Sequence, residues 1–526
     1  MADLDIISDL KKRGLDCYNK GSYKEAEELY KTVLSMVKTE DPYALADVYI
    51  RLANTYYKLK NIDSYVKYYE KYLKLFPDGQ VAVFSRLAHA YYFIDSNKSI
   101  EYHNKGLDCE VNEYDATCKL FAMIKSSNYT QQEVKSEAEF EINRLKSSIY
   151  NDVIKYTHED KKYPKDKLNV GYLSSDCHTH IMMNYILPIW KNHDTSRFNI
   201  TIYNGSSKND STSEEISRIP NFKMVKCANM SVSELAEKIC DDGIDILVDL
   251  SGYTHLKSMV HLYKPAPIII SYLGYLNTLG ISEVDYILAT RTAIPEACAE
   301  WYVEKPLYLD CGYHVFKPSA NLPEISNCPY ETNGYITFGS FNCTSKFSPA
   351  ILYLWAKILE SVPESRLLIY RTKMAKNVVK RLQNKFAELG IEPQRIIYKS
   401  TPYTPHLLAY NEVDIALDTY PFSGMSIGIE NELMGVPVIT LTGEGLQSKG
   451  AAAVNSAAGL EEFNADCGED YIKNAVNLAN DREKLKELRH TLRDKILNSR
   501  ICTQAEAFTR NLEEKYFEVW DKFINS

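Results

Sequence analysis

From residue 167 onward the chain alternates short, continuous apolar runs with segments of helical character, and this alternation limits the fold more than any other feature. Runs of this kind lie at 168–173, 244–250, 335–341 and 413–417. Continuous apolar strands separated by helices are typical of a parallel β-sheet that is covered on both faces. The sequence therefore predicts an α/β architecture over most of the chain.

A loose stretch at 311–333, which contains three prolines, divides this series into two halves. The chain has 526 residues, too many for one ordinary hydrophobic core. Open α/β sheets bind ligands beyond the carboxyl ends of their strands. We therefore expect two Rossmann-like domains, at 166–318 and 333–500, with the functional cleft between them and a C-terminal helix at 501–526.

The first 112 residues have a different pattern, which is helical and repeats itself. Small residues followed by aromatic residues recur at Gly14, Ala53 and Ala88, which are 39 and 35 residues apart. Both spacings are close to the 34-residue period of tetratricopeptide units. A small residue lets two helices approach closely, and the aromatic side chains fill the groove between them. The pattern predicts tetratricopeptide-like repeats at 1–112, which often offer a concave surface to an extended protein segment.

A helical connector is expected at 113–165, between the repeats and the first α/β domain. Its second part, from Tyr129 to Tyr156, carries several glutamates at spacings that suggest a solvated face. These are Glu133, Glu137, Glu139 and Glu141. A polar hinge at 158–166 then ends the connector.

The composition argues against several classes of function. A formal net charge of −9 is unfavourable for a nonspecific grip on nucleic acid or an anionic membrane. No run approaches the roughly 20 apolar residues of a membrane span, and the start shows no signal-peptide pattern. The 12 cysteines form no CxxC pair and no metal-binding cluster with histidine. We expect a cytoplasmic protein with reduced thiols, no metal cofactor and no nucleic-acid partner.

Polar and glycine-rich clusters follow four of the predicted strands. They occupy 174–180, 250–255, 339–349 and 417–430. Because the carboxyl ends of parallel strands meet at one edge of a sheet, these clusters are expected to border the cleft.

These clusters resemble those of the protein O-linked N-acetylglucosamine transferases and their relatives, which include the SPINDLY-type O-fucosyltransferases. The resemblance runs from about Leu168 to Leu460. It is carried by the stretches GYLSSDCHTH, DILVDLSGYT, KPAPIIISYLGYLNTLG, FGSFNCTSKFSPAILYLWAKILESVPESRLLI and DIALDTYPFSGMSIGIENELMGVPVITLTGE. It implies a GT-B glycosyltransferase fold, formed by two Rossmann-like domains behind an all-α repeat region. It also implies an inverting, metal-independent reaction.

The same resemblance assigns roles to individual residues. His180 matches a histidine close to the donor sugar and acceptor, and Lys346 matches a lysine that contacts the donor pyrophosphate, so both are candidate catalytic residues. A fixed cation there would stabilise the departing diphosphate. The donor-binding candidates are His406 near the base, Glu430 at the ribose, Gly274, Tyr275 and Thr278 at the sugar, and Asn342, Asp418, Gly424, Ser426 and Gly428. Tyr253 and Thr254 are the candidates for acceptor binding.

The donor site also departs from the family pattern. Met425-Ser426-Ile427 stands where many members have His-Thr-Thr, and Leu276 lies within a stretch that others write YPGTSG or YPNTTG. The expected reaction is transfer of N-acetylglucosamine from UDP-GlcNAc to Ser or Thr of a protein acceptor bound by the repeats and the cleft. Three alternatives remain open: O-fucosylation from GDP-fucose, N-glucosylation of Asn from UDP-glucose, and a degenerate transferase that serves as a scaffold. The stretches GSFN, LDTYPF and NTLG are closer to the SPINDLY side, which favours fucose among the alternatives.

Overall fold

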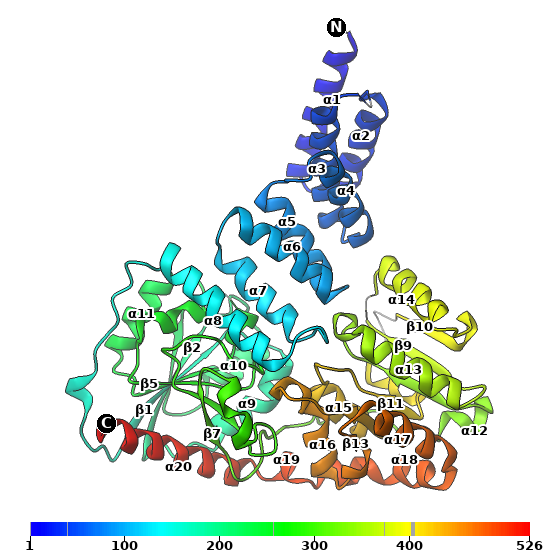
Figure 1. The fold of residues 1–526 in the computed structure, drawn as a ribbon. Coiled ribbons are helices and arrows are strands. Elements are labelled where there is room, and N and C mark those ends of the chain that lie inside the picture. The colour runs from blue at the N-terminus through cyan, green and yellow to red at the C-terminus, as the bar shows by residue number, and fades with distance from the viewer. Residues whose placement is uncertain (1, 39, 256, 373, 401–405) are drawn as a thin grey trace.

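The structure is a computed structural model that describes residues 2–38, 40–255, 257–372, 374–400 and 406–526. It has three parts, shown in Figure 1: an N-terminal helical region and two α/β halves. No helix in the described ranges is both long and apolar enough to cross a membrane.

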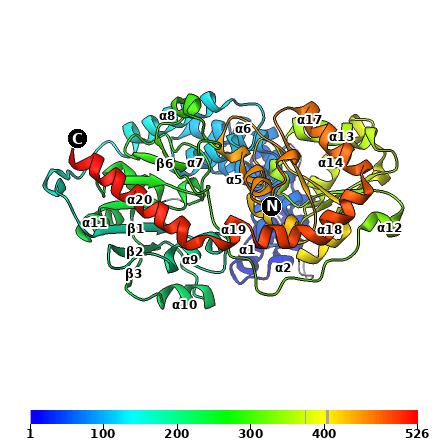
Figure 2. The same cartoon turned by 90° about the horizontal axis from the view of Figure 1, so that it is seen from below.

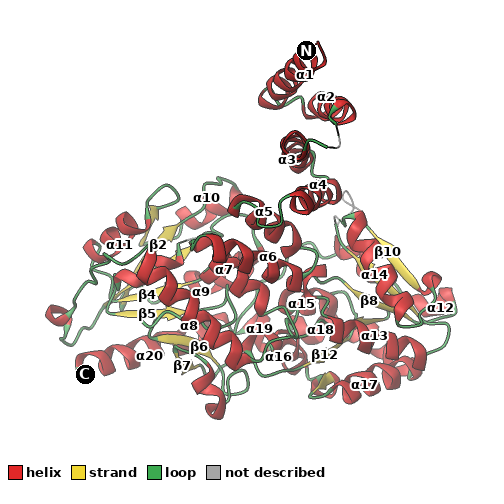
Figure 3. Ribbon diagram, turned by 45° about the horizontal axis from the view of Figure 1, so that its top comes forward, coloured by secondary structure: helices red, strands yellow, loops and turns green. Residues whose placement is uncertain are grey.

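Three antiparallel helix pairs form the repeat region, whose N-terminal helices extend away from the α/β halves (Figure 3). Its helices are α1 (Ala2–Asn19), α2 (Tyr23–Met36), α3 (Pro42–Lys58), α4 (Ile62–Leu75), α5 (Val81–Tyr92) and α6 (Ser96–Cys109). The recurring small residues lie on the first helix of each pair. A Cβ atom at Gly14 would come within 2.6 Å of the Tyr30 ring of α2. The expected close approach of helices is therefore confirmed at Gly14.

Two further helices, α7 (Glu113–Met123) and α8 (Gln131–Ser148), join the repeats to the first α/β half. Thr130 and Glu133 form a capping box that begins α8. The prediction of a solvated glutamate face was wrong for Glu141, which is fully buried. Its carboxylate accepts from Lys119 Nζ at 2.7 Å and pairs with Arg144, so cations from α7 and from α8 itself compensate the buried charge.

The first half is a seven-stranded parallel sheet with the order β3-β2-β1-β4-β5-β6-β7. Its strands are β1 (Leu168–Ser174), β2 (Phe198–Asn204), β3 (Phe222–Lys226), β4 (Ile246–Asp249), β5 (Ile268–Ser271), β6 (Tyr286–Ala289) and β7 (Lys305–Tyr308). Helices α9 (Ile181–Lys191), α10 (Ser211–Ser217) and α11 (Val232–Asp241) connect the first four strands. The last helix, α20 (Ala505–Ile524), returns from the second half and packs against α9 and β5. Figure 2 shows it running across the first half.

The second half is a six-stranded parallel sheet with the order β10-β9-β8-β11-β12-β13. Its strands are β8 (Thr337–Ser340), β9 (Arg366–Tyr370), β10 (Ile396–Lys399), β11 (Ile415–Leu417), β12 (Val438–Leu441) and β13 (Asn464–Ala465). Its helices are α12 (Pro329–Asn333), α13 (Pro349–Ser361), α14 (Lys376–Glu388), α15 (Met425–Leu433), α16 (Gly450–Ala458), α17 (Gly468–Asn480), α18 (Arg482–Leu497) and α19 (Arg500–Thr503). Two parallel, helix-covered sheets confirm the predicted α/β fold.

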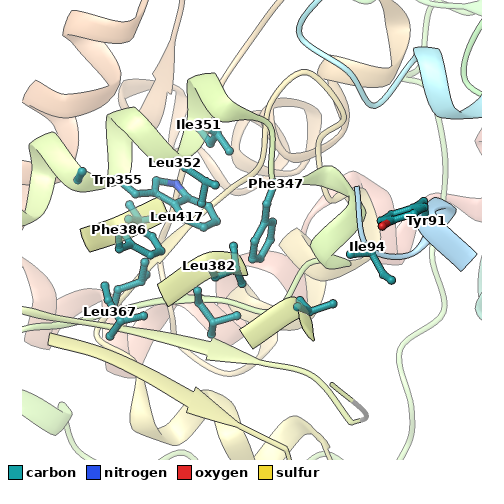
Figure 4. Close-up of a cluster of buried hydrophobic side chains, with 14 of the residues drawn as sticks. Tyr91, Ile94, Phe347, Ile351, Leu352, Trp355, Leu367, Leu382, Phe386 and Leu417 are labelled. Carbon is teal, nitrogen blue, oxygen red and sulfur yellow. The ribbon is translucent and has the colours of Figure 1, made fainter. Parts of the chain in front are cut away.

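The helical region shares buried cores with both halves. Tyr91 and Ile94 of the repeats belong to the same hydrophobic cluster as Phe347 and Trp355 of the second half (Figure 4). Helix α8 packs against the first half, where Lys146 pairs with Glu283 at 2.9 Å. The last repeat helices and the connector therefore pack against the α/β halves, whereas the first repeat helices project beyond them (Figure 1).

Candidate active site

A buried carboxylate, Asp418, organises the loops that follow β8 and β11. It accepts hydrogen bonds from Asn342 Nδ2 at 3.1 Å, Ser423 Oγ at 2.6 Å, the Gly424 N–H at 2.9 Å and Thr440 Oγ1 at 2.8 Å. Gly424 is the N-cap residue of α15, and a Cβ atom there would collide with the Asn342 side chain. The N-terminus of α15 is thus held tightly against the loop after β8.

Lys346 lies beside this helix N-terminus. Its Nζ donates to the Ser423 carbonyl oxygen at 3.0 Å and is 4.2 Å from the centre of the Phe422 ring. Burial lowers the pKa of Lys346 to about 8, although the nearby Asp418 carboxylate opposes the shift. A cation next to the free N–H groups of a helix N-terminus forms a site for an anion such as a phosphate.

Two cations that the sequence analysis did not select add to this positive character. Arg371 follows β9 directly and donates to the Phe341 carbonyl oxygen at 2.9 Å. Lys125 comes from the helical connector. Burial alone would raise the pKa of the Cys343 thiol, but a hydrogen bond from Ser345 and the charges of Arg371 and Lys125 bring it below its ordinary value. Arg371 was detectable from its place at the end of a predicted strand, whereas Lys125 gave no signal.

Three predicted donor-binding residues lie on or against α15. Glu430 accepts from His406 Nε2 at 3.0 Å and from the Tyr410 hydroxyl at 2.8 Å. The hydrogen bond to Glu430 raises the pKa of His406. The structure thus brings His406 and Glu430 together. Gly428 lies where α15 packs on α16, with Ala451 in van der Waals range of an added Cβ atom.

Helix α9 brings the first half to the same place. His180 is the N-cap residue of α9, and its Nδ1 accepts from the Met182 N–H at 3.5 Å and lies 3.5 Å from Asp176. Its side chain is 41% exposed. One and a half turns later, the Tyr185 hydroxyl is 2.8 Å from Ser426 Oγ on α15. The helix that begins at His180 therefore touches the helix that begins beside Lys346.

The loops after β4 and β5 pack closely against each other. Gly274 has no room for a side chain, because the Leu250 carbonyl oxygen occupies that position. Tyr275 packs edge to face on Tyr253, at 5.0 Å between ring centres, and on Phe121 of α7, at 5.6 Å.

Two of the predicted ligand-contacting residues use their hydroxyl groups for hydrogen bonds within the protein. Thr278 is fully buried and its Oγ1 accepts from the Gly280 and Val303 N–H groups, each at 3.2 Å. The Tyr253 hydroxyl donates to the Leu279 carbonyl oxygen. Thr254 is exposed. Ligand contacts by Thr278, Tyr253 and Thr254 stay predictions.

All three parts of the molecule meet at one amide cluster. Asn277 Nδ2 donates to Gln131 of α8 and to Gln447 of the second half, at 2.9 Å each. All three side chains are buried. Among the residues that the structure describes, no group of three or more His, Cys, Asp or Glu side chains is placed to hold a metal ion.

Two Rossmann-like halves that meet beside a helix N-terminus, with cations around it, define a glycosyltransferase of the GT-B class. A model of glycosyl transferase family 41 matches residues 133–327 and 324–512. The chain belongs to this family.

Comparison with known proteins agrees with this assignment. SPINDLY of Solanum lycopersicum is 30% identical over 378 residues, which cover 70% of this chain and 40% of that protein. SPINDLY of Oryza sativa subsp. japonica is 31% identical over 382 residues, 70% of this chain and 41% of that protein. The chain thus matches about two fifths of the length of these relatives. A variant of the Thermobaculum terrenum O-GlcNAc transferase has the same fold, with a TM-score of 0.81, 24% identity and coverage of 100% of this chain and 99% of that one.

Proposed function

We propose that the protein is an inverting O-glycosyltransferase that transfers a sugar from a nucleotide-sugar to Ser or Thr of a protein acceptor. The observation that carries this proposal is the position of Lys346 beside the N-terminus of α15, at the carboxyl ends of β8 and β11. A nucleoside diphosphate is the leaving group of such a donor, and its charge is what this arrangement can bind.

In the proposed reaction, the acceptor hydroxyl oxygen attacks the anomeric carbon from the face opposite the diphosphate. The bond between that carbon and the diphosphate oxygen breaks, and the electron pair leaves with the nucleoside diphosphate. The Lys346 ammonium and the N–H groups of α15 stabilise the negative charge that develops on this leaving oxygen. The acceptor proton passes to a base, for which the exposed His180 imidazole at the start of α9 is the candidate.

The donor is proposed to be UDP-N-acetylglucosamine. The names of the plant SPINDLY relatives read "Probable UDP-N-acetylglucosamine–peptide N-acetylglucosaminyltransferase", which supports this choice. GDP-fucose is the second candidate, because three motif stretches of the donor site are closer to the SPINDLY side of the family. The repeats and the cleft are proposed to hold the acceptor protein, and no metal cofactor is expected. A cytoplasmic location stays a prediction.

The test is a donor screen with the purified full chain. UDP-N-acetylglucosamine, GDP-fucose and UDP-glucose are offered separately with a mixture of Ser-, Thr- and Asn-containing peptides, with and without a chelator. Mass spectrometry then reports the sugar mass and the modified residue. Labelling of Ser or Thr in the presence of chelator supports the proposal. Labelling of Asn, or none with any donor, contradicts it.

A further inference from the structure

Two lysines of the helical connector are buried to the same degree, but only one of them is paired with carboxylates. Lys119 and Lys125 are each 6% exposed. Lys119 pairs with Glu137 and with Glu141. Lys125 has no carboxylate and no hydrogen-bond acceptor within bonding distance among the described residues. Burying an unpaired charge is unfavourable for folding, so the lack of a partner at Lys125 requires an explanation.

Aromatic rings hold the Lys125 ammonium in place. Its Nζ is 3.6 Å from the centre of the Tyr92 ring of α5 and 4.2 Å from that of Phe121 of α7. The face of an aromatic ring attracts a cation but does not neutralise its charge. The two rings therefore fix the position of the Lys125 ammonium, but no anion balances its charge.

The same rings connect Lys125 with the candidate active site. The Phe121 ring is 6.3 Å from the Phe422 ring, and Lys346 Nζ is stacked on that second ring at 4.2 Å. The groups that act on Lys125 electrostatically are Cys343, Lys346 and Cys118, and no carboxylate is among them. Burial, with the charge of Lys346 in addition, lowers the pKa of Lys125 to about 7, while the two thiols oppose the shift.

The side chains at the start of α15 offer few donors to a phosphate. Met425 and Ile427 carry no donor, and the hydroxyl of Ser426 lies 2.8 Å from that of Tyr185. Lys346 and Arg371 supply two positive charges here, and a diphosphate bound at this helix N-terminus can take a further cation. Lys125 can supply this cation, because its ammonium has no acidic partner and stacks on Phe121, the ring next to Phe422.

We infer that Lys125 is a donor-binding residue whose ammonium contacts the diphosphate of the nucleotide-sugar from the side of the helical connector. This inference rests on the proposed function. It makes the helical region part of the donor site as well as an acceptor surface. Because Lys125 is held between a repeat helix and α7, bound donor would stabilise the position of the repeats against the α/β halves.

The test is titration calorimetry of the full chain with UDP and GDP, and with uridine and guanosine, which carry no phosphate. The variants are Lys125→Met and, as a polar but uncharged second variant, Lys125→Gln. The matched control is Lys71→Met, because Lys71 also stacks on two rings, Tyr49 and Tyr68, but lies in α4 away from the site. Thermal unfolding of each ligand-free variant is measured alongside.

Both Lys125 variants are expected to bind the preferred nucleoside diphosphate at least about tenfold more weakly, with nucleoside binding and Lys71→Met unchanged. Ligand-free Lys125→Met is expected to unfold at the same or a higher temperature than the wild type, because an unpaired buried charge has been removed. Equal affinity of wild type and Lys125 variants for the nucleoside diphosphate overturns the inference alone, and so does an equal loss of nucleoside affinity. A wild-type chain that binds neither UDP nor GDP overturns the proposed function, and the inference with it.

Discussion

Both α/β halves have a buried aspartate at the end of equivalent strands, but the loops that these aspartates hold form different surfaces. In each sheet a buried aspartate lies at the carboxyl end of the strand beside the first one: Asp249 is the last residue of β4, and Asp418 directly follows β11. Asp249 accepts from the Ser251 and Gly252 N–H groups and from His261, and Asp418 accepts from the loop before α15. Short 3-10 turns follow Asp249, whereas α15 begins seven residues after Asp418.

This difference separates two tasks. The second half presents a helix N-terminus with Lys346 and Arg371, which suits a charged diphosphate. The first half presents His180, an exposed imidazole on a helix that touches α15. We interpret the second half as the holder of the nucleotide and the first half as the source of the proton acceptor. The predictions below test this division, from the largest expected effect to the smallest.

The assignment of nucleotide binding to the second half requires that Lys346 be essential for transfer. Lys346→Met is expected to lower kcat/KM for the donor by at least about a hundredfold, because it removes the cation that stabilises the leaving diphosphate. Donor hydrolysis and peptide labelling are the measurements. The matched control is Lys357→Met, a lysine of the same half that pairs with Glu360 on the surface of α13. Near wild-type transfer by the Lys346 variant would contradict the assignment.

The next prediction tests whether His180, in the first half, acts as the base. His180→Asn keeps a side-chain acceptor for the start of α9 but removes the imidazole. We expect kcat to fall by roughly a hundredfold, because general-base catalysis is lost, while the dissociation constant for the nucleoside diphosphate is unchanged. Steady-state kinetics and calorimetry measure the two quantities. A loss of nucleotide affinity equal to the loss of kcat would place His180 in nucleotide binding instead.

Matched substitutions of the two buried aspartates test whether nucleotide binding belongs to the second half alone. Asp249→Asn and Asp418→Asn each place an amide N–H₂ group opposite buried donors, so each is expected to lower the free energy of unfolding by about 2–3 kcal/mol. Only Asp418→Asn is expected to weaken nucleoside diphosphate binding, since only its loop leads into α15. Urea denaturation and calorimetry are the measurements. Equal effects of both variants on nucleotide affinity would contradict the division between the halves.

The pH dependence should also follow the second half. The pKa of Lys346 is lowered to about 8, so its ammonium is present below pH 8 and is lost as the pH rises above it. We expect kcat/KM to begin to fall from about pH 7, where Lys125 loses its charge, and to fall more steeply above about pH 8, where Lys346 does. Lys346→Arg, whose guanidinium stays charged, should remove the steeper fall above pH 8 in whatever activity it retains. An unchanged fall in that variant would assign the titration to another group.

The sequence predicted the two sheets because their apolar runs are continuous and separated by helices, and it placed Lys346 and Gly424 at strand ends for the same reason. It did not predict Lys125, because the rings of Tyr92, Phe121 and Phe422 come together only through tertiary packing. The error at Glu141 has the same cause, since its partner Lys119 lies on another helix. Pairings between distant segments leave no periodic signal in the sequence.

Hydrogen exchange of the full chain, with and without the preferred nucleoside diphosphate, tests the central claim most directly. If the second half holds the diphosphate, protection should be concentrated at the amides of 342–347 and at the N-terminus of α15. The amides of 174–181, at the start of α9, should change little. Protection confined to 174–181, or to the loops after β4 and β5, would contradict the assignment of the anion site to the second half.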